Sequence, residues 1–168
     1  AAWSVRTEGS TLRLVVDDHL AVDVDAFERR ADAAERLESA GDAVAALDDR
    51  LAAIEIWQGE PFVESAYEEW AITEAERLRL RLLRQLVRAA EVTAAIGRPD
   101  EAIELANRAL AIEPAAENAA RALMEGHLGR DDIGSARAVH RRTLAALDEM
   151  GFAPEEATVE LGRRLGAG

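Results

Sequence analysis

The sequence is constrained first by the residue types that it lacks. None of its 168 residues is cysteine, and all 20 of its basic residues are arginine. Without cysteine the chain has no disulfide, no thiolate nucleophile and no cysteine-ligated zinc site. No uninterrupted apolar run approaches the roughly 18 residues that a membrane-spanning helix needs, and the N-terminus lacks the layout of a signal peptide. We therefore expect a soluble, cytoplasmic protein without a membrane segment.

Positive charge is also scarce. The formal net charge is −13 at pH 7, whereas a protein that binds nucleic acid needs a basic surface to neutralise phosphates. We therefore expect these residues not to bind DNA on their own. Because the chain begins without methionine, we also expect it to be a piece of a longer protein.

A pattern typical of a pair of helices occurs twice. In each copy a glycine is followed by alanines five and twelve residues later. The positions are Gly41, Ala46 and Ala53 in the first copy and Gly97, Ala102 and Ala109, followed by Pro114, in the second. Alanines seven residues apart lie on one helix face and let two helices pack closely. Because one helical pair cannot bury its apolar face alone, the repeat predicts a single all-helical array that serves as a docking surface.

The first 20 residues follow a different pattern. Apolar and polar residues alternate from Trp3 to Glu8 and again from Leu12 to Val16, with a turn signal at Gly9-Ser10. This predicts a β-hairpin in residues 1–20, ahead of a helical domain in residues 21–168. An isolated hairpin is marginally stable, so we expect it to pack on the helices or to complete a sheet with sequence absent from this chain.

Capping residues, glycines and prolines divide the rest of the chain into about seven helices. The first starts at Asp25, which forms a capping-box-like pair with Glu28, and the second runs from Asp42 to about Trp57. After a loop at 58–65, a long helix begins at about Ala66 or Thr73 and continues to residue 96. The last four helices span about 99–112, 115–128, 132–150 and 155–165. The expected fold class is all-α, built from antiparallel helical pairs.

Residues that commonly carry chemistry are scattered along the sequence. His19, His127 and His140 form no HxxxH or HExxH motif, and no phosphate-binding, dinucleotide-binding or serine-nucleophile motif is present. The acidic residues are dispersed over the helices, and the segment GRDDIGS at 129–135 lacks the ligand spacing of a calcium loop. We therefore predict a protein that is not an enzyme and has no catalytic residues, no cofactor and no metal site.

One basic feature stands out in the long helix. Arg77, Arg81, Arg84 and Arg88 are spaced by four, three and four residues, which places them on one helix face, opposite a core face of leucines. In so acidic a chain this arginine stripe is most simply a solvated face held by salt bridges. The alternative is that it binds an acidic protein partner or a phosphate backbone, and the four arginines are therefore our candidate partner-binding residues.

Two tryptophans flank the loop at 58–65. This stretch, QGEPFVES, contains Gly59 and Pro61 and is the longest loop that the sequence predicts. We expect Trp57 and Trp70 to anchor the core on either side of it. The alternative is a platform on which a ligand stacks.

The order of these features resembles a known family. Three motifs carry the resemblance: VD…FE at residues 24–28, W-x-G at residues 57–59 with Pro61 after it, and E-x-W…E-x-x-R-L at residues 68–78. Together with the preceding hairpin, they resemble the bacterial transcriptional activation domain of the actinobacterial antibiotic regulatory protein (SARP) family. The resemblance covers nearly the whole chain. The third glycine–alanine pair departs from the pattern, because Ala136 follows Gly129 by seven residues instead of five.

The resemblance implies a tetratricopeptide-like helical regulatory domain of a transcription regulator. In that family a winged helix-turn-helix DNA-binding domain precedes the helices, so residues 1–20 would be the remnant of its wing and DNA would be bound only through the missing upstream domain. The implied partner is RNA polymerase or another domain of the same regulator, and the full-length proteins act as oligomers.

Two hypotheses from other classes compete with this interpretation. One is a generic tetratricopeptide-like adaptor that holds a peptide or protein in its concave groove and has no link to transcription. The other is an enzyme, which no motif supports. The hairpin and the long, arginine-striped helix favour the regulatory domain, because a generic adaptor needs neither.

Overall fold

The computed structural model describes residues 4–8, 11–15, 23–63 and 67–166. The first two ranges form β1 (Ser4–Glu8) and β2 (Thr11–Val15), which pair antiparallel with Arg6 opposite Arg13. The turn predicted at Gly9-Ser10 lies outside the described residues, as does His19.

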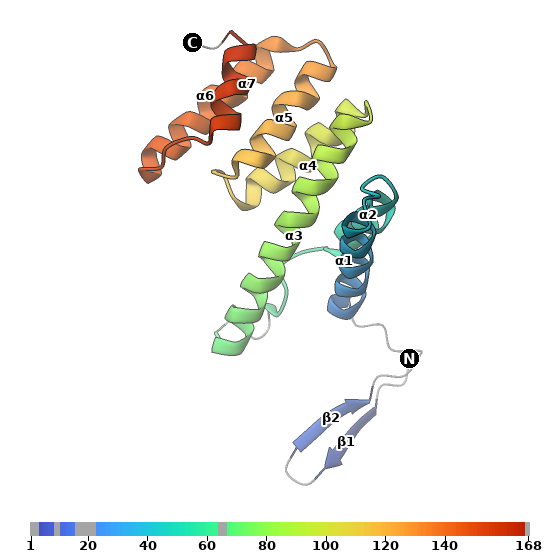
Figure 1. Ribbon diagram of the computed structural model, residues 1–168. Helices are drawn as coiled ribbons and strands as arrows, with labels where there is room; N and C mark the ends of the chain where they lie inside the picture. The colour runs from blue at the N-terminus through green and yellow to red at the C-terminus, as the bar shows by residue number, and fades with distance from the viewer. Residues whose placement is uncertain (1–3, 9–10, 16–22, 64–66, 167–168) are drawn as a thin grey trace.

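Seven helices account for most of the described residues that follow (Figure 1). They are α1 (Asp23–Ser39), α2 (Ala45–Ile56), α3 (Glu69–Ala95), α4 (Pro99–Ile112), α5 (Glu117–Gly129), α6 (Ile133–Met150) and α7 (Glu156–Arg164). The prediction of an all-α domain of about seven helices is confirmed for this part of the chain.

The helices pack as consecutive pairs around the long helix α3. The pairs are α1 with α2, α3 with α4, and α5 with α6, while α7 packs on α5 and α6. In Figure 1, α1 and α2 lie on one side of α3 and α4 to α7 lie on the other. The N-terminal half of α3 extends beyond α4 to α7, so that part of it is left without helical neighbours on that side (Figure 1).

The two glycines of the repeat have the same structural role. Gly41 follows α1 with φ +90° and Gly97 follows α3 with φ +76°, a left-handed conformation that glycine adopts without a steric penalty. In both turns the next backbone N–H reaches back to the helix, from Asp42 to Leu37 O and from Arg98 to Thr93 O. Each glycine thus ends the first helix of its pair and allows the second helix to return antiparallel to it.

The repeated alanines pack where the prediction places them, in contact between helices. Ala46, Ala53, Ala102 and Ala109 are all fully buried. Larger side chains complete the core around them: Phe27, Leu47, Ile54, Leu78, Leu82 and Leu86 in the first helices, and Leu105, Leu123, Met124, Val139, Leu161 and Leu165 in the later ones. A continuous core of this kind is expected when neighbouring pairs stack.

One helix starts two residues before its predicted position, and the start of another falls within the range that the sequence left open. α1 begins at Asp23 instead of Asp25, and the Asp23 carboxylate accepts a hydrogen bond from the backbone of Val24. α3 begins at Glu69, between the two predicted starts, and Thr73 lies inside the helix with its hydroxyl bonded to Glu69 O. A threonine or aspartate can satisfy a backbone group within the first turns as well as at the cap, so the motif alone does not locate the start.

Other boundary signals are correct or nearly so. Pro99 is the first residue of α4, and Asp132 accepts from Ser135 N at 2.9 Å at the start of α6. Asp42 accepts from Ala45 N at 2.8 Å, although α2 itself begins at Ala45. No helix in the described ranges has a segment long and apolar enough to cross a membrane.

Candidate protein-interaction surface

The arginine stripe of α3 is paired with an acidic face of α1. Three of its four arginines form ion pairs with carboxylates of that helix. The pairs are Arg77 with Glu28, Arg81 with Asp32, and Arg88 with Glu38. The two members of each pair are about fifty residues apart in the sequence. The stripe therefore joins α3 to α1 and does not pair only with carboxylates of α3.

Arg81 is the centre of this contact. Its side chain is only 11% exposed, and it also lies 3.5 Å from carboxylate oxygens of both Glu28 and Glu35. Arg77 and Arg88, at either end of the stripe, are nearly half exposed. A partner could therefore reach the two ends without disturbing α1, whereas Arg81 is available only if its own ion pairs open.

Arg84 differs from the other members of the stripe. It is exposed and forms no ion pair with any residue that the structure describes. It lines a cavity of about 430 Å³ between α1, α2, α3 and α5, whose other charged lining residues are Arg50, Arg88, Glu35 and Glu38. Binding of a partner by the four arginines stays a prediction, and Arg84 is the member best placed for it.

A buried polar connection lies beneath the stripe. Arg50 of α2 is 1% exposed, and its Nη1 donates to Gln85 Oε1 at 2.8 Å. Gln85 Nε2 donates to Glu35 Oε1 at 3.0 Å, and Arg50 also pairs with Glu38. Because buried polar groups are costly unless they are hydrogen-bonded, this connection favours one arrangement of α1, α2 and α3. The sequence analysis missed Arg50, since its helical position gives no sign of its depth.

The row of ion pairs between α1 and α3, which we call the charged seam, shifts the pKa values of several of its side chains. Burial disfavours ionisation of Glu38, but the hydrogen bond from Arg88 and the charges of Arg50 and Arg88 outweigh it and lower the pKa of Glu38 below its ordinary value of 4.5. A hydrogen bond from Arg77 likewise lowers the pKa of Glu74. Hydrogen bonds to Glu74 and Glu28 raise the pKa of Arg77.

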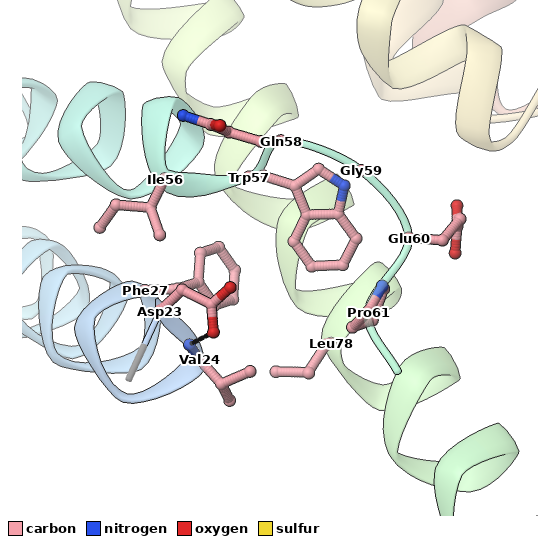
Figure 2. Close-up of a pocket in the computed structure, with 10 residues that line it drawn as sticks. All are labelled: Asp23, Val24, Phe27, Ile56, Trp57, Gln58, Gly59, Glu60, Pro61 and Leu78. Atoms are coloured by element: carbon pink, nitrogen blue, oxygen red, sulfur yellow. Dashed lines mark hydrogen bonds between the residues drawn. The ribbon is translucent and has the colours of Figure 1, made fainter. Parts of the chain in front are cut away.

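An apolar cavity lies where α1 begins, α2 ends and α3 passes (Figure 2). It measures about 260 Å³, and its apolar lining is Val24, Phe27, Trp57, Pro61 and Leu78, together with Ile56. Phe27 and Trp57 meet edge to face with centroids 5.7 Å apart. Figure 2 shows Val24 and Leu78 pointing toward each other across the cavity. Trp57 packs against the core as predicted.

A second cavity continues from the first. It measures about 350 Å³ and shares Glu60 and Pro61 with its neighbour. Its apolar lining is Phe62, Val63, Ala71, Ile72 and Ala75. We call the two cavities together the apolar trough; it runs from the start of α1, past the α2–α3 loop, to the first turns of α3.

The predicted role of Trp70 as a core anchor is wrong. Trp70 is 57% exposed and packs edge to face on Phe62, with centroids 5.4 Å apart. Tyr67 is completely exposed beside it. An indole is usually buried because of its large apolar area, but here the first turn of α3 lies beyond the helices that would cover it. In the sequence, the concentration of large apolar residues around the loop at 58–65 is the signal from which this exposed apolar site could have been predicted.

Carboxylates border the apolar trough. Asp23 and Glu60 line the first cavity, and Glu60 and Glu76 line the second. Arg79 lies between the last two, 2.6 Å from Glu60 and 3.1 Å from Glu76. The border therefore carries one arginine against three carboxylates.

The two described histidines lie apart from both features. His140 is buried on α6 against Gly162 of α7, and its Nε2 has no hydrogen-bond partner. His127 Nδ1 lies 3.8 Å from Asp132 Oδ2. Within the described residues no three histidine or acidic side chains are grouped as metal ligands would be.

Stacked helical pairs define a class of protein, the helical-repeat domain, whose members typically present long surfaces for binding. The family comparison gives the particular case. Residues 22–165 match the family described as bacterial transcriptional activator domain, and the chain belongs to that family. A comparison with curated proteins finds no match. The family is a regulatory one, in agreement with the transcriptional role that the sequence motifs implied.

Proposed function

We propose that this chain is the non-catalytic, protein-interaction domain of a bacterial transcription regulator of the SARP family. The observation that carries the proposal is the family match over residues 22–165. The stacked helical pairs, which we interpret as tetratricopeptide-like, add support, because such arrays bury their cores between neighbours and leave long surfaces for binding. The activator would work in the cytoplasm, where bacterial transcription takes place.

We further propose that DNA is read by a domain upstream of this chain. A net charge of −13 disfavours contact with a phosphate backbone by these residues themselves. In this proposal residues 1–20 are the wing of that reader domain and residues 21–168 are the regulatory domain. The protein partner is RNA polymerase or another domain of the same regulator, and the full-length protein forms an oligomer. The generic peptide-binding adaptor is disfavoured because the family match over residues 22–165 is to a transcriptional activator domain.

A tethering assay tests the proposal. The chain is fused to an unrelated DNA-binding protein, and transcription is measured from a bacterial reporter that carries the matching operator upstream of a weak promoter. We expect the fusion to raise transcription above the level obtained with the DNA-binding protein alone. An unchanged reporter, with the fusion present at equal amount and bound to the operator, would contradict an activating role.

A further inference from the structure

We infer that the apolar trough binds a protein segment whose apolar anchor side chains are flanked by arginine or lysine. This inference rests on the proposed function, since it identifies the surface and the partner chemistry through which the domain would act. Two observations carry it: the apolar area exposed around the trough and the sign of the charge at its border.

The exposed apolar area is concentrated in one place. Ten large apolar side chains are exposed among the described residues, and four of them, Val63, Tyr67, Trp70 and Ile72, lie within ten residues of the sequence. Their exposed fractions are 69%, 100%, 57% and 56%. Val63 and Ile72 line the second cavity, and Trp70 packs on Phe62 in its lining. The others, such as Ile133 on α6 and Phe152 after it, are spread over the remaining elements. A contiguous apolar patch with polar edges marks a protein-binding site, and tyrosine and tryptophan are the residues that most often dominate binding energy.

The cavities provide places for anchor side chains. With volumes of about 260 and 350 Å³ and a shared wall at Pro61, they are neighbours along one path. Two apolar side chains from one short segment would fill them and cover Ile72 and Val63. Figure 2 shows the Glu60 carboxylate pointing away from the apolar side chains, so it does not block the first cavity.

The charge of the border selects the partner. Glu60 and Glu76 share Arg79, whereas Asp23 forms no ion pair with described residues. Three carboxylates against one arginine leave the border negative, and like charges across an interface are costly. A partner with basic residues beside its apolar anchors fits this border, while an acidic segment is repelled. A second copy of this chain, at −13, would have to bring one of its few basic surfaces to the trough.

Binding of a synthetic peptide provides the test. The probe is a short, fluorescently labelled peptide with leucines three and four residues apart and arginines between them, and the control peptide has glutamate at each arginine. Fluorescence anisotropy with the whole chain should show saturable binding of the arginine peptide that weakens as salt is added. The glutamate peptide should not bind.

Matched variants locate the binding surface. Ile72→Ser and Trp70→Ser should each weaken binding of the arginine peptide by about tenfold, while Ile133→Ser and Phe152→Ser, at equally exposed positions outside the trough, should leave it unchanged. Glu60→Gln with Glu76→Gln, at the border of the second cavity, should weaken binding and reduce its dependence on salt. The matched control is Asp148→Asn with Glu149→Gln, an exposed acidic pair at the end of α6. Circular dichroism verifies that each variant is folded.

The outcomes separate this inference from the proposed function. Failure of the arginine peptide to bind, equal binding of the glutamate peptide, or unchanged binding by the trough variants would overturn the inference. So would sedimentation showing that the chain pairs with itself through the trough and that Ile72→Ser abolishes the pairing. The tethered reporter is measured independently. Activation of the reporter without peptide binding would reject the trough as a binding surface and retain the proposed activator function. Peptide binding without activation of the reporter would reject the activator function.

Discussion

Above its apolar core, the first half of the domain has a row of ion pairs between α1 and α3, whereas the second half has close helix contacts at glycines. Between α1 and α3 the contacts include three arginine–carboxylate pairs above a buried arginine and glutamine. Between α4 and α5, Gly126 packs so closely that a Cβ atom there would lie 2.9 Å from Ile103 Cγ1. Between α6 and α7, a Cβ atom at Gly162 would lie 2.2 Å from His140 Nε2.

This difference shows that one architecture can be stabilised in two ways. Glycine and alanine contacts depend on shape, so they tolerate changes of charge but not of volume. Ionic contacts depend on partners and solvent, so they weaken with acid and salt. The charged half is also the half that carries the apolar trough. The surface we assign to binding therefore lies in the part of the domain whose helix contacts respond to solution conditions.

Removal of the buried arginine should have the largest effect. Arg50→Ala leaves Gln85 Oε1 without its donor, and a buried polar group left without a hydrogen bond costs about 1–3 kcal/mol. The cavity that the lost side chain leaves adds to this cost. The measurement is the free energy of unfolding in urea. Arg29→Ala, at an exposed position of α1 with no ion pair to described residues, is the control and should change stability by less than about 0.5 kcal/mol. A similar small loss for both variants would mean that Arg50 does not hold the three helices.

In the second half of the domain, adding a single methyl group at a close helix contact should lower the free energy of unfolding more than removing an exposed charge does. Gly162→Ala forces His140 or α7 to move, and overpacking of this kind costs about 1–3 kcal/mol. Adding His140→Ala should recover part of the loss, because the obstructing ring is then absent; a double-mutant cycle measures this coupling. The control is Gly134→Ala on the exposed part of α6, which should stabilise the chain by about 0.5–1 kcal/mol. No coupling between positions 162 and 140 would contradict the close contact.

Among the arginines of the stripe, the loss of stability on substitution should depend on how deeply the side chain is buried. Arg81→Gln removes the most buried member of the stripe and should reduce the free energy of unfolding by about 1 kcal/mol, near the upper end for partly exposed ion pairs. Arg84→Gln should change it by only a few tenths. Urea unfolding at low and high salt tests both, and the difference between the variants should narrow as salt rises. Equal costs would indicate that the pairs to α1 add nothing to stability.

The smallest expected effect is on acid stability. Since Glu38 has a lowered pKa in the folded chain, its contribution to stability is complete above its ordinary value of 4.5 and is lost as the pH falls through the lower, folded-state pKa. Glu38→Gln should therefore make the decline in stability below pH 4.5 less steep. Glu104→Gln, at an exposed position of α4, should leave that decline unchanged. Unfolding free energies measured at neutral pH and in acid provide the comparison. If stability fell with pH in the same way in the wild type and in Glu38→Gln, Glu38 would not be a source of the loss of stability in acid.

Local rules predicted much of the helical framework. Gly41, Gly97 and Pro99 have conformations that only a few residue types accept, so their positions indicate where helices end and begin. The capping signal at Thr73 did not mark a helix start, because its hydroxyl bonds the backbone inside α3, and α1 begins two residues before Asp25. The stripe of α3 was predictable as a face, since its spacing places four arginines on one side. Its partners on α1 were not, because they are distant in sequence.

The exposed trough was the least predictable feature. Trp57 and Trp70 look alike in sequence, yet Trp57 packs on Phe27 and Trp70 is 57% exposed. Their difference arises from the length of α3, whose first turns extend past the helices that cover the rest of it. Burial depends on which neighbours arrive from elsewhere in the chain, and periodicity within one helix does not contain that information.

By itself the sequence determined the helical class, the helical pairs, the acidic character and, through its motifs, the family, because each of these follows from local spacing or from composition. Only the tertiary structure decided that α1 neutralises most of the arginine stripe, that Arg50 lies in the interior and that Trp70 borders an open apolar trough. Those features depend on how helices about fifty residues apart stack against one another, and stacking determines which charges meet and which apolar side chains remain in water.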